Sequence, residues 1–529
     1  METYNAIIVG FGPTGATMAN LLGSMGLRVA VVERDLQIFD QPRAITADHE
    51  ALRAFQAVGL ADAVEVGTCP HPGTDFVGVD GQVIKQFYPM PSPGPLGWEP
   101  TFMFHQPTLE TVLRQGVERF DAVDVMLGHK LIEFHQDAEG VEAIVSGPGE
   151  ARHVLRADYL LACDGARSLV RTGIKARLHD LAFDEWWVVV DTQLHTDIDL
   201  PERCVQYCRP SRPGTYIVGP GRLRRWEIKV MPGEDPSAFN NPEYVNRVLA
   251  SFVDTSAVDV QRVAVYRFHA VVAEKWRDRR VFLMGDAAHQ MPPFLGQGMC
   301  AGLRDAYNLA WKLEAVLKGR APDSLLDTYG EERRPHVQTV VAHAKSFGLV
   351  IGELDESAAV QRDERLAAEL AAGTAPTIRQ SFIPGLEAGL LGRNVDSTLV
   401  KGAGLLFPQP WVIDGAGGRA RLDDLVRGDF YAVSNDQKLA EHAAIHFESV
   451  NSLAKAKSIL LEQSGEIGHG VVAVRESEAI VERWLAENDA RLAIVRPDGF
   501  AYGVALDVEG VTALISQLEA SLTLEESVE

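Results

Sequence analysis

The sequence predicts an α/β protein with more than one domain, and three observations support this fold class. Residues 5–33 read as strand, tight turn, helix and strand, which is typical of a parallel βαβ unit. Residues 184–231 form short runs of alternating apolar and polar side chains, as antiparallel strands do. Residues beyond 400 alternate strand-like and helical segments, which predicts a small α/β domain. At 529 residues the chain is also too long for one ordinary domain.

Composition and charge exclude several classes of protein. Hydrophobic residues make up 46% and charged residues 23% of the chain, as in soluble globular proteins. A net charge of −23 argues against binding to nucleic acid or to an anionic membrane, because both would repel the chain. No apolar run approaches the roughly 20 residues that span a bilayer, and the N-terminus does not resemble a signal peptide. The five cysteines include no CxxC pair, so we expect reduced thiols, no metal site and a cytoplasmic location.

A glycine-rich turn follows the first predicted strand. Gly10, Gly12 and Gly15 form the pattern GxGxxG between that strand and a predicted helix. The first glycine permits the tight turn, the second lets a pyrophosphate approach the backbone, and the third lets helix and strand pack closely. The helix N-terminus offers N–H groups to phosphates, and Glu33, at the end of the next strand, can accept hydrogen bonds from ribose hydroxyls. The pattern predicts a Rossmann-like dinucleotide site without distinguishing NAD from FAD.

A second buried strand indicates which dinucleotide is bound. The stretch "VFLMGDAAHQMPPFLGQG" (281–298) delivers Asp286 to a glycine-rich segment. If this strand shares a sheet with the first one, Asp286 can reach the same ligand farther along. FAD, unlike NAD, has a ribityl chain whose hydroxyls can donate to a carboxylate. The predicted helix 299–319 would also point its positive end at the flavin edge that becomes negative on reduction. These features favour FAD; the alternative is an ordinary strand-to-helix turn.

Three motifs together resemble the FAD-dependent aromatic hydroxylases, the class A flavoprotein monooxygenases. They are GxGxxG at 10–15, "ACDGARSLVR" at 162–171 and the segment 281–313. The shorter segments "PRA" (42–44) and "FHQP" (104–107) also match the pattern, and the resemblance covers roughly residues 1–350. Within the family the chain most resembles the branch that hydroxylates 3-(3-hydroxyphenyl)propionate. The segments that support this closer match are "PRAITADHEALRAFQAVGL", "WWVVVD", "KVMPGE", "LLDTYGEERR" and "VRPDGF".

The resemblance implies cofactor contacts for residues that match the motifs. Arg43 is expected near the FAD pyrophosphate and Gln106 near the ribityl chain. Without the pattern, these two would be interpreted as a surface charge and a turn residue. Asp164, followed by Gly165, is associated in this family with both FAD and the nicotinamide cofactor.

The second motif region is expected to surround the flavin ring. Asp286 would bind the flavin ribose region, and Pro292 and Gly298 would line the ring. No second GxGxxG unit follows a predicted strand, so NADH or NADPH is expected as a transient co-substrate rather than a resident cofactor, with O2 as the third reactant. Glu33 is expected to bind the ribose of FAD, not that of the nicotinamide cofactor, so it does not indicate whether NADH or NADPH is used.

The resemblance and the patterns together divide the chain. We expect a Rossmann-like FAD-binding domain in two parts, residues 1–180 with mixed insertions and residues 276–390 with long helices. An antiparallel-sheet substrate domain is expected at 181–275. Residues 400–529 resemble the thioredoxin-like C-terminal domain of the larger members. Because this last part contains no cysteine, dithiol chemistry is excluded there, and its role is expected to be a dimer surface or a tail packed on the catalytic part.

The catalytic residues are less well indicated than the cofactor site. Hydroxylation of a phenol needs an electrophilic oxygen, which in this family comes from a flavin C(4a)-hydroperoxide, and a group that favours the phenolate. His289 is the first candidate, and a structural part of the turn is the alternative. Tyr207, on a predicted strand, can hydrogen-bond a phenol, although a core tyrosine is the more common case. Arg225 can steady the flavin or an acidic substrate tail, or can belong to a solvated basic cluster.

The leading hypothesis is therefore an NAD(P)H- and O2-dependent hydroxylase of a small phenol. It would add a hydroxyl group ortho to an existing one, on a compound such as 3-hydroxyphenylpropionate. One alternative is a hydroxylase of larger polyketide-type or polycyclic phenols. The other is a flavin-binding protein without monooxygenase activity. A homodimer is a further expectation.

Overall fold

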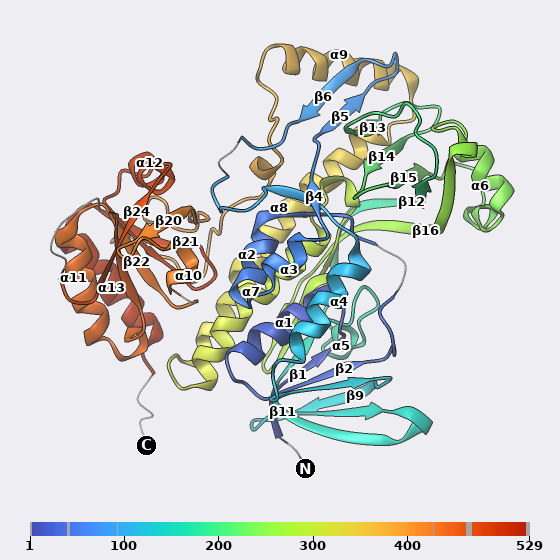
Figure 1. Cartoon of the computed structure of the whole chain (residues 1–529). Coiled ribbons are helices and arrows are strands. Elements are labelled where there is room, and N and C mark those ends of the chain that lie inside the picture. Colours follow the sequence, from blue (N-terminus) through green and yellow to red (C-terminus); the bar gives the residue numbers. More distant parts are fainter. Residues whose placement is uncertain (1–2, 40–42, 92–93, 427, 462–467, 525–529) are drawn as a thin grey trace.

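The computed structural model describes residues 3–39, 43–91, 94–426, 428–461 and 468–524. They form a mixed α/β structure with several sheets, in which a C-terminal α/β unit lies beside a larger body (Figure 1). Within these ranges, no helix combines the length and the apolar character needed to cross a bilayer.

The first sheet carries the predicted βαβ unit. Its main path runs β17-β18-β11-β1-β2-β8, and β10 and β9 extend it from β11. The neighbours from β18 to β8 along this path are parallel. The strand before Asp286 therefore shares a sheet with the first strand, which is the condition under which Asp286 can reach the ligand of the glycine turn. The strands are β1 (Thr3–Val9), β2 (Val29–Glu33), β8 (Val123–Leu127), β9 (Lys130–Gln136), β10 (Val141–Ser146), β11 (Arg152–Ala162), β17 (Arg277–Asp278) and β18 (Val281–Leu283).

Helices pack against this sheet and form the central body. The helix α1 follows the glycine turn and packs against α4 and α7. The predicted helix 299–319 is α7, and it ends two residues early because Gly319 adopts the left-handed conformation (φ +66°). The helices of this body are α1 (Pro13–Ser24), α2 (His49–Ala57), α3 (Ala61–Glu65), α4 (Gln106–Val117), α5 (Leu169–Gly173), α7 (Gly298–Leu317) and α8 (Asp327–Ile351). The helix α9 (Glu356–Ala371) instead packs against β6 (Val83–Phe87), a strand of the second sheet.

The second sheet is largely antiparallel and lies beyond the ends of β11 and β18. Its order is β19-β16-β12-β15-β14-β13-β5-β6, and only the β13–β5 pair is parallel among the pairs described. One face is covered by α6 (Pro242–Leu249) and an apolar cluster that includes Trp226 and Ile228. The strands are β5 (Thr74–Val77), β6 (Val83–Phe87), β12 (Leu178–Leu194), β13 (Cys204–Tyr207), β14 (Gly214–Val218), β15 (Leu223–Lys229), β16 (Val258–Ala273) and β19 (His289–Gln290). A small third sheet, β3 (Thr46–Asp48), β7 (Thr101–Met103) and β4 (Cys69–Pro70), lies between the two.

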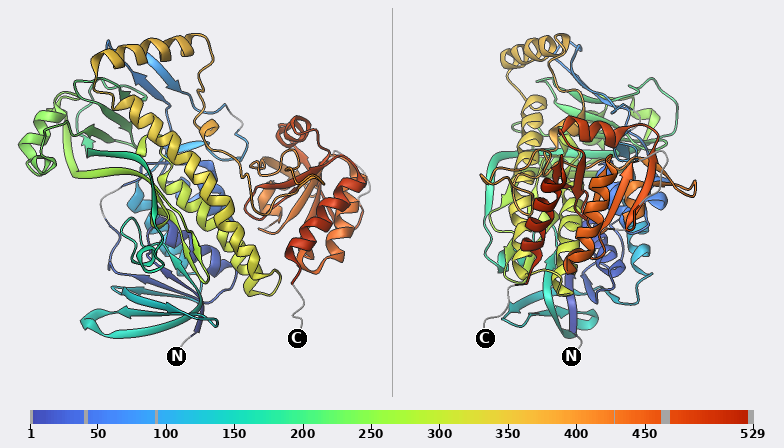
Figure 2. Two further views of the ribbon diagram at one scale, coloured as in Figure 1. Left: turned by 180° about the vertical axis from the view of Figure 1, so that it is seen from behind. Right: turned by 90° about the vertical axis from the view of Figure 1, so that its left-hand side faces the viewer.

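The C-terminal unit has its own sheet, in the order β21-β20-β24-β23-β22-β25-β26. The two views of Figure 2 place this unit beside the long helices of the central body. Trp311 of α7 meets Phe430 edge to face, with ring centroids 5.5 Å apart, so α7 contributes to the core of the unit. Its elements are β20 (Trp411–Asp414), β21 (Arg419–Arg421), α10 (Leu422–Val426), β22 (Tyr431–Ser434), α11 (Gln437–Ser449), β23 (Lys457–Leu461), β24 (Val471–Glu476), α12 (Ile480–Glu487), β25 (Leu492–Val495), β26 (Ala501–Ala505) and α13 (Val508–Leu522).

Candidate active site

The turn between β1 and α1 brings backbone atoms unusually close together. Gly10 has φ of +100°, and a Cβ atom there would lie 2.3 Å from the carbonyl oxygen of Cys163. A Cβ atom on Gly15 would lie 2.0 Å from the carbonyl oxygen of Gly10. Both positions therefore exclude a side chain. Gly12 differs, because a Cβ atom there meets nothing within 4 Å, and open space remains over the N-terminus of α1.

Glu33 closes the same turn from the end of β2. Its carboxylate accepts hydrogen bonds from the backbone N–H of Phe11 at 2.7 Å and of Asp35 at 2.9 Å. The side chain is buried and lies outside the lining of the cavity described below. The carboxylate thus braces the glycine turn, and each oxygen retains a lone pair for a further donor.

Two other strands of the first sheet end at an aspartate beside a glycine. β11 leads to Asp164 and Gly165, and β18 leads to Gly285 and Asp286. One carboxylate oxygen of Asp164 accepts the backbone N–H of Val170 at 3.2 Å, and the other is buried without a hydrogen bond to any residue that the structure describes. Burial raises the pKa of Asp164. Asp286 is exposed and lines the cavity described below, as does Gly165, whereas Asp164 itself lies outside the cavity lining.

Gln106, the first residue of α4, fixes the segment that carries Arg43. Its Oε1 accepts the backbone N–H of Arg43 at 2.8 Å and of Ala44 at 2.7 Å. Its Nε2 donates to Glu110 at 2.7 Å. Gln106 is buried and the Arg43 side chain is exposed, and both line the cavity. Gln106 therefore shapes the cavity through the backbone at 43–44 as well as through its own side chain.

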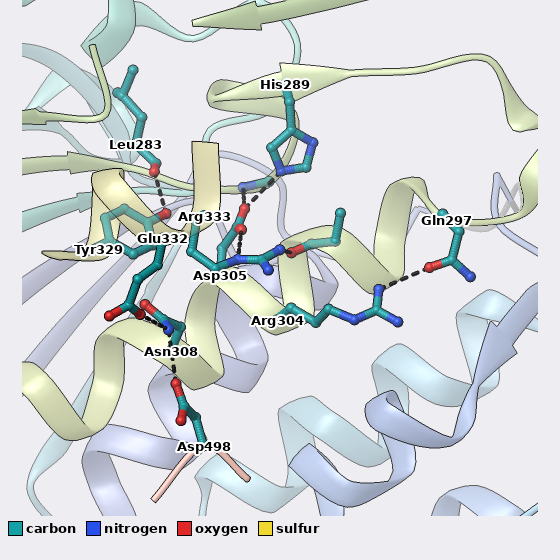
Figure 3. A network of polar contacts seen from close by, with 12 residues as sticks. Leu283, His289, Gln297, Arg304, Asp305, Asn308, Tyr329, Glu332, Arg333 and Asp498 are labelled. Atoms are coloured by element: carbon teal, nitrogen blue, oxygen red, sulfur yellow. Dashed lines mark hydrogen bonds and ion pairs between the residues drawn. The ribbon is translucent and has the colours of Figure 1, made fainter. Parts of the chain in front are cut away.

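Gln297, the residue before α7, is held in place by side-chain hydrogen bonds. Gln297 donates to a carboxylate oxygen of Asp48 at 3.0 Å and accepts from Arg304 at 2.9 Å, as Figure 3 shows for the second contact. All three side chains are buried. These contacts join the loop before α7 to Asp48, the last residue of β3, and to the body of α7, so the N-terminus of α7 is held in a fixed position.

The loop residues around Gln297 form one end of the cavity. Gly298 begins α7 and lines the cavity, and the first N–H groups of a helix have no partner within it. Pro292, which was expected to line the flavin ring, is buried and does not belong to the cavity wall. Its neighbour Pro293 does, because the single turn at 293–295 presents that residue instead.

A single cavity of about 430 Å³ joins these segments to the second sheet. One side of its wall, which we call the dinucleotide cradle, includes Gly12, Arg43, Gln106, Gly165, Asp286 and Gly298. The sheet side includes Val189, Gln206, Thr215, Ile217, Arg225, Glu227 and Phe268. A dinucleotide cradle and a mixed apolar and polar sheet therefore face one another across the same space.

Comparison with known proteins identifies the family. Residues 3–344 match the family model described as FAD binding domain, and residues 404–521 match the HcaD C-terminal domain. The chain is 33% identical to the probable NADH-specific resorcinol 4-hydroxylase of Rhodococcus jostii (strain RHA1), over 98% of this chain and 96% of the relative. It is 32% identical to the 3-(3-hydroxy-phenyl)propionate/3-hydroxycinnamic acid hydroxylase of Comamonas testosteroni, over 98% and 96% of the two chains. The chain belongs to the FAD-dependent aromatic hydroxylases.

Solved structures share the fold of this aromatic hydroxylase. The flavin-dependent monooxygenase PieE, in complex with FAD and substrate, gives a TM-score of 0.83 at 21% identity, covering 98% of this chain and 99% of that one. Aklavinone-11 hydroxylase with FAD and aklavinone gives 0.77 at 23% identity, with the same coverage. At these identities the likeness concerns the fold alone, and it confirms the mixed α/β architecture.

The cradle of the hydroxylase fits FAD. The open space at Gly12 admits a pyrophosphate beside the N-terminus of α1. Farther along the same wall, the strand ends contribute the Asp286 carboxylate and the residues Cys163 and Gly165, whereas Asp164 lies outside the lining. The predicted FAD dependence thus agrees with the donors and acceptors of the cavity as well as with the family.

Of the predicted catalytic residues, Arg225 lies in the cavity wall. Its guanidinium binds the Asp191 carboxylate through two nitrogens, at 2.6 and 3.1 Å, and both side chains are buried. It also donates to the carbonyl oxygen of Arg43 at 2.7 Å. Arg262 binds the same carboxylate at 3.1 Å. Arg225 therefore shares the Asp191 carboxylate with Arg262 and connects the second sheet to the Arg43 segment.

His289 lies outside the cavity wall. Its Nε2 is 2.8 Å from a carboxylate oxygen of Asp305, and its ring stacks on Trp276 with centroids 5.5 Å apart. Asp305 also accepts the backbone N–H of Gly285 and the Nε of Arg333, both at 3.0 Å (Figure 3). Although burial acts to raise it, the nearby His289 and Arg333 hold the pKa of Asp305 below its usual value. The structure therefore places His289 in a buried network that supports the strand end, which is the structural alternative considered above.

Tyr207 also lies outside the wall. Its ring meets Phe252 with centroids 5.4 Å apart, and the Arg209 guanidinium lies 5.3 Å from the ring centroid. Burial raises its pKa. These contacts place Tyr207 on the face of the second sheet opposite Gln206, which is its neighbour on β13 and lines the cavity.

Sequence reasoning missed three charged residues of the wall, Glu227, Arg267 and Arg379. Glu227 follows Arg225 by two positions on β15, so strand alternation places both on one face. Charged residues on a buried strand face were the available signal. Arg379 donates to the carbonyl oxygen of Leu295 at 3.1 Å and to Thr74 Oγ1 at 3.2 Å. It lies in a loop-rich passage that has no periodic pattern to indicate its neighbours.

Proposed function

We propose that this protein hydroxylates a single-ring phenol ortho to its existing hydroxyl group, using FAD, NADH and O2. The observation that carries the proposal is the single cavity of about 430 Å³, which is lined by the dinucleotide cradle at one side and by the second sheet at the other. The flavin ring must occupy part of this space, so the remainder suits a small aromatic substrate. The relatives named for resorcinol and for 3-(3-hydroxyphenyl)propionate act on compounds of this class.

The residue roles at the cofactor are part of the proposal. We assign the ADP half of FAD to the glycine turn and the ribityl and ring half to the strand ends and the α7 N-terminus. The first group comprises Gly10, Gly12, Gly15, Glu33 and Arg43. The second comprises Gln106, Asp164, Asp286 and Gly298. When bound and reduced, FAD activates O2 so that one oxygen atom can pass to an electron-rich aromatic carbon.

The chain itself must bind the ring, orient it and keep water away. Val189, Ile217 and Phe268 give the sheet side apolar surface against which a ring can pack. Arg225 fixes the distance between the sheet and the Arg43 segment through its bond to the Arg43 carbonyl. Such fixed walls hold the reacting carbon in place, which is the main contribution that positioning makes to a transfer of this kind.

The test is a substrate panel on purified holoenzyme. Resorcinol, 3-hydroxyphenylpropionate, 3-hydroxycinnamate, hydroxybenzoates and polycyclic phenols would be scored by stimulated NADH oxidation, O2 uptake and product mass. We expect a single-ring phenol to accelerate NADH oxidation and to gain one oxygen atom. Preference for a polycyclic phenol would contradict the substrate size proposed here. A yellow protein whose NADH oxidation no phenol accelerates would leave it a flavin-binding protein without hydroxylase activity.

NADH rather than NADPH is proposed as the electron donor. The Rhodococcus relative is named NADH-specific, and it aligns with nearly the whole chain. Measuring kcat/KM for both nucleotides with the best phenol of the panel tests this choice. A higher value with NADPH would refute it.

For the C-terminal unit we propose a thioredoxin-like fold with a structural role. The parallel pair β22–β23, the helix α11, the antiparallel pair β25–β26 and the final helix α13 support this fold. Residues 400–529 contain no cysteine, so the unit has no dithiol to react. Its packing on α7 through Trp311 favours the role of a tail packed on the catalytic part. The expected homodimer stays a prediction, for which the molar mass in solution is the test.

A further inference from the structure

Glu227 lies at the centre of the sheet side of the cavity. It occupies β15, opposite Val189 on β12 and opposite Thr215 on β14. Gln206 on β13 continues this row across the sheet, and all four residues line the cavity. Glu227 is 4% exposed, so its carboxylate has little contact with bulk water.

The carboxylate of Glu227 makes no hydrogen bond to any residue in the described parts of the chain. Thr215 is its nearest polar neighbour in the row, but the Thr215 hydroxyl donates to Gln206 Oε1 at 2.6 Å. Arg225 on the same strand points its guanidinium at Asp191, and not at Glu227. A buried carboxylate without a donor is costly unless a ligand supplies one.

We propose that Glu227 is the proton acceptor for the hydroxyl group of the phenolic substrate. The inference rests on the proposed function, since it concerns the phenol that the hydroxylase binds. The phenolic O–H bond breaks, its proton moves to a carboxylate oxygen of Glu227, and the electron pair stays on the phenolate oxygen. The negative oxygen then directs electron density to the ortho carbon. That carbon would take one oxygen atom of the O2 that bound, reduced FAD activates, while the O–O bond breaks and the other atom ends as water. Loss of the proton from the same ring carbon restores the aromatic ring. Glu227 is a catalytic residue in this assignment because it touches the substrate.

The charges around Glu227 suit this task. Burial raises the pKa of Glu227 to about 7, and Arg225 acts in the opposite direction. Asp191 raises the pKa further and Arg262 lowers it. A base with a pKa near the working pH combines a large ionised fraction with a strong tendency to take a proton.

The other ionisable groups of the wall are poorer proton acceptors. Burial, together with Arg379, lowers the pKa of His71 well below its usual value, so this ring binds a proton weakly. His269 is at the rim, where its side chain is 37% exposed and lies 3.7 Å from Asp184. The remaining charged side chains of the wall are Arg43, Arg267, Arg379 and Asp286. The three arginines cannot accept a proton, and Asp286 lies at the cofactor end.

The first test compares pH profiles. In the wild type, kcat/KM for the phenol should rise with pH through about 7, because Glu227 must be ionised to accept a proton. Glu227→Gln should lower kcat/KM by about 10²- to 10⁴-fold and remove this rise. Glu227→Asp should restore part of the activity and keep a rise. Thr215→Val is the matched control, since it changes the same row but leaves the carboxylate, and it should keep the rise.

The second test needs binding alone and therefore does not depend on hydroxylation. The holoenzyme would be titrated with 4-nitrophenol, whose phenolate form absorbs visible light, and difference spectra would be recorded across the pH range. We expect the bound phenolate band to appear at a lower pH in the wild type and in Thr215→Val than in Glu227→Gln, where it should follow the ionisation of free 4-nitrophenol. A Glu227→Gln variant that keeps the wild-type pH dependence of both the phenolate band and kcat/KM would overturn the proposal. The two proposals can fail separately. If no phenol of the panel were hydroxylated, the proposed function would be refuted. If the phenolate band of 4-nitrophenol still depended on the residue at position 227, the role of Glu227 as proton acceptor would nevertheless be supported.

Discussion

At the scale of single residues, the three glycines of the first turn have different roles: two allow close backbone packing and one leaves space for a ligand. Gly10 and Gly15 lack room for a Cβ atom because backbone oxygens lie against them. Gly12 has room, and the space belongs to the cavity. A substitution at Gly15 should therefore harm the fold, whereas one at Gly12 should harm the binding of the cofactor.

Gly12→Val should yield a folded protein that lacks FAD. The valine side chain would fill the space that the pyrophosphate needs, so we expect flavin content to fall at least about tenfold, which corresponds to about 1.4 kcal/mol. Flavin absorbance per protein in the purified variant measures this loss. Gly415→Val is the matched control, because Gly415 also has open space but lies far away in the C-terminal unit, and its flavin content should be unchanged. A fully yellow Gly12→Val protein would contradict the cofactor assignment.

Asp286→Ala should weaken FAD binding and leave the fold intact. Asp286 is exposed in the cavity, so its loss removes acceptors for the ligand without opening the core. We expect Kd for FAD to rise about 10- to 100-fold, as for loss of hydrogen bonds to a charged group. Fluorescence titration of the apoprotein with FAD measures the change, and Asp121→Ala, at an exposed turn before β8, serves as the control. Equal affinity in wild type and Asp286→Ala would refute the role.

At the scale of elements, a buried network fixes the start of α7 relative to the end of β18. Asp305 on α7 accepts from the backbone of Gly285 and from the side chains of His289 and Arg333 (Figure 3). The side chains of Asp305, His289 and Arg333 are buried. The network explains why His289 follows the Asp286 turn: it positions the strand end and does not reach the cavity. A sequence pattern that places a histidine beside a functional aspartate does not reveal this, because the partners come from α7 and α8.

Asp305→Asn should destabilise the fold by about 3–5 kcal/mol, because Arg333 would remain buried without its counterion. Chemical denaturation of the two proteins measures the difference. Since the pKa of Asp305 is lowered in the fold, its contribution is present above the ordinary aspartate pKa and is lost as the pH falls below it. The variant should therefore lose less stability than the wild type on acidification.

Asp323→Asn is the control for this variant. Asp323 pairs with Arg277, but its side chain is 62% exposed, so the pair is screened by water and its loss should change stability by less than about 1 kcal/mol. Equal effects of the two substitutions would show that the Asp305 network does not support the fold.

At the scale of the whole molecule, buried ion pairs join the C-terminal unit to the central body. Arg496 binds Glu332 of α8 at 2.7 Å and Asp498 at 2.7 Å. Lys312 of α7 binds the same carboxylate of Glu332, and Asn308 bridges it to Asp498. All of these side chains are buried. The unit is thus fixed to α7 and α8, rather than attached through the linker alone.

Arg496→Met should weaken the attachment of the C-terminal unit to α7 and α8. Two buried carboxylates would lose their main counterion, so we expect a loss of about 3–5 kcal/mol in chemical denaturation and easier proteolytic release of the C-terminal unit. Arg491→Met is the control, because Arg491 makes a surface pair with Asp436 at 3.4 Å within the same unit. Although burial acts to raise it, Arg496 and Lys312 lower the pKa of Glu332 to about 2, so its contribution holds above the ordinary glutamate pKa and is lost as the pH falls toward 2. A variant that matched the wild type in proteolysis would indicate that the linker alone holds the unit.

The sequence by itself determined the cofactor side of this protein. The glycine turn, Glu33 and the strand that leads to Asp286 are local patterns, because a turn, a helix start and a strand end are each specified by a few consecutive residues. These patterns, with the motif resemblance, predicted the family that the comparisons show. The matched residues Arg43 and Gln106 line the cavity for the same reason, whereas Pro292 missed it by one position in a tight turn.

Only the tertiary structure decided the substrate side. The cavity wall joins side chains from β5, β12, β13, β14, β15 and β16 with Arg379, which are up to about 300 positions apart. Whether a charged residue there is paired depends on neighbours across strands: Arg225 pairs with Asp191, whereas Glu227 accepts no hydrogen bond within the described structure. Pairing and burial set the chemistry of a carboxylate, and both are properties of the assembled sheet rather than of any segment of the chain.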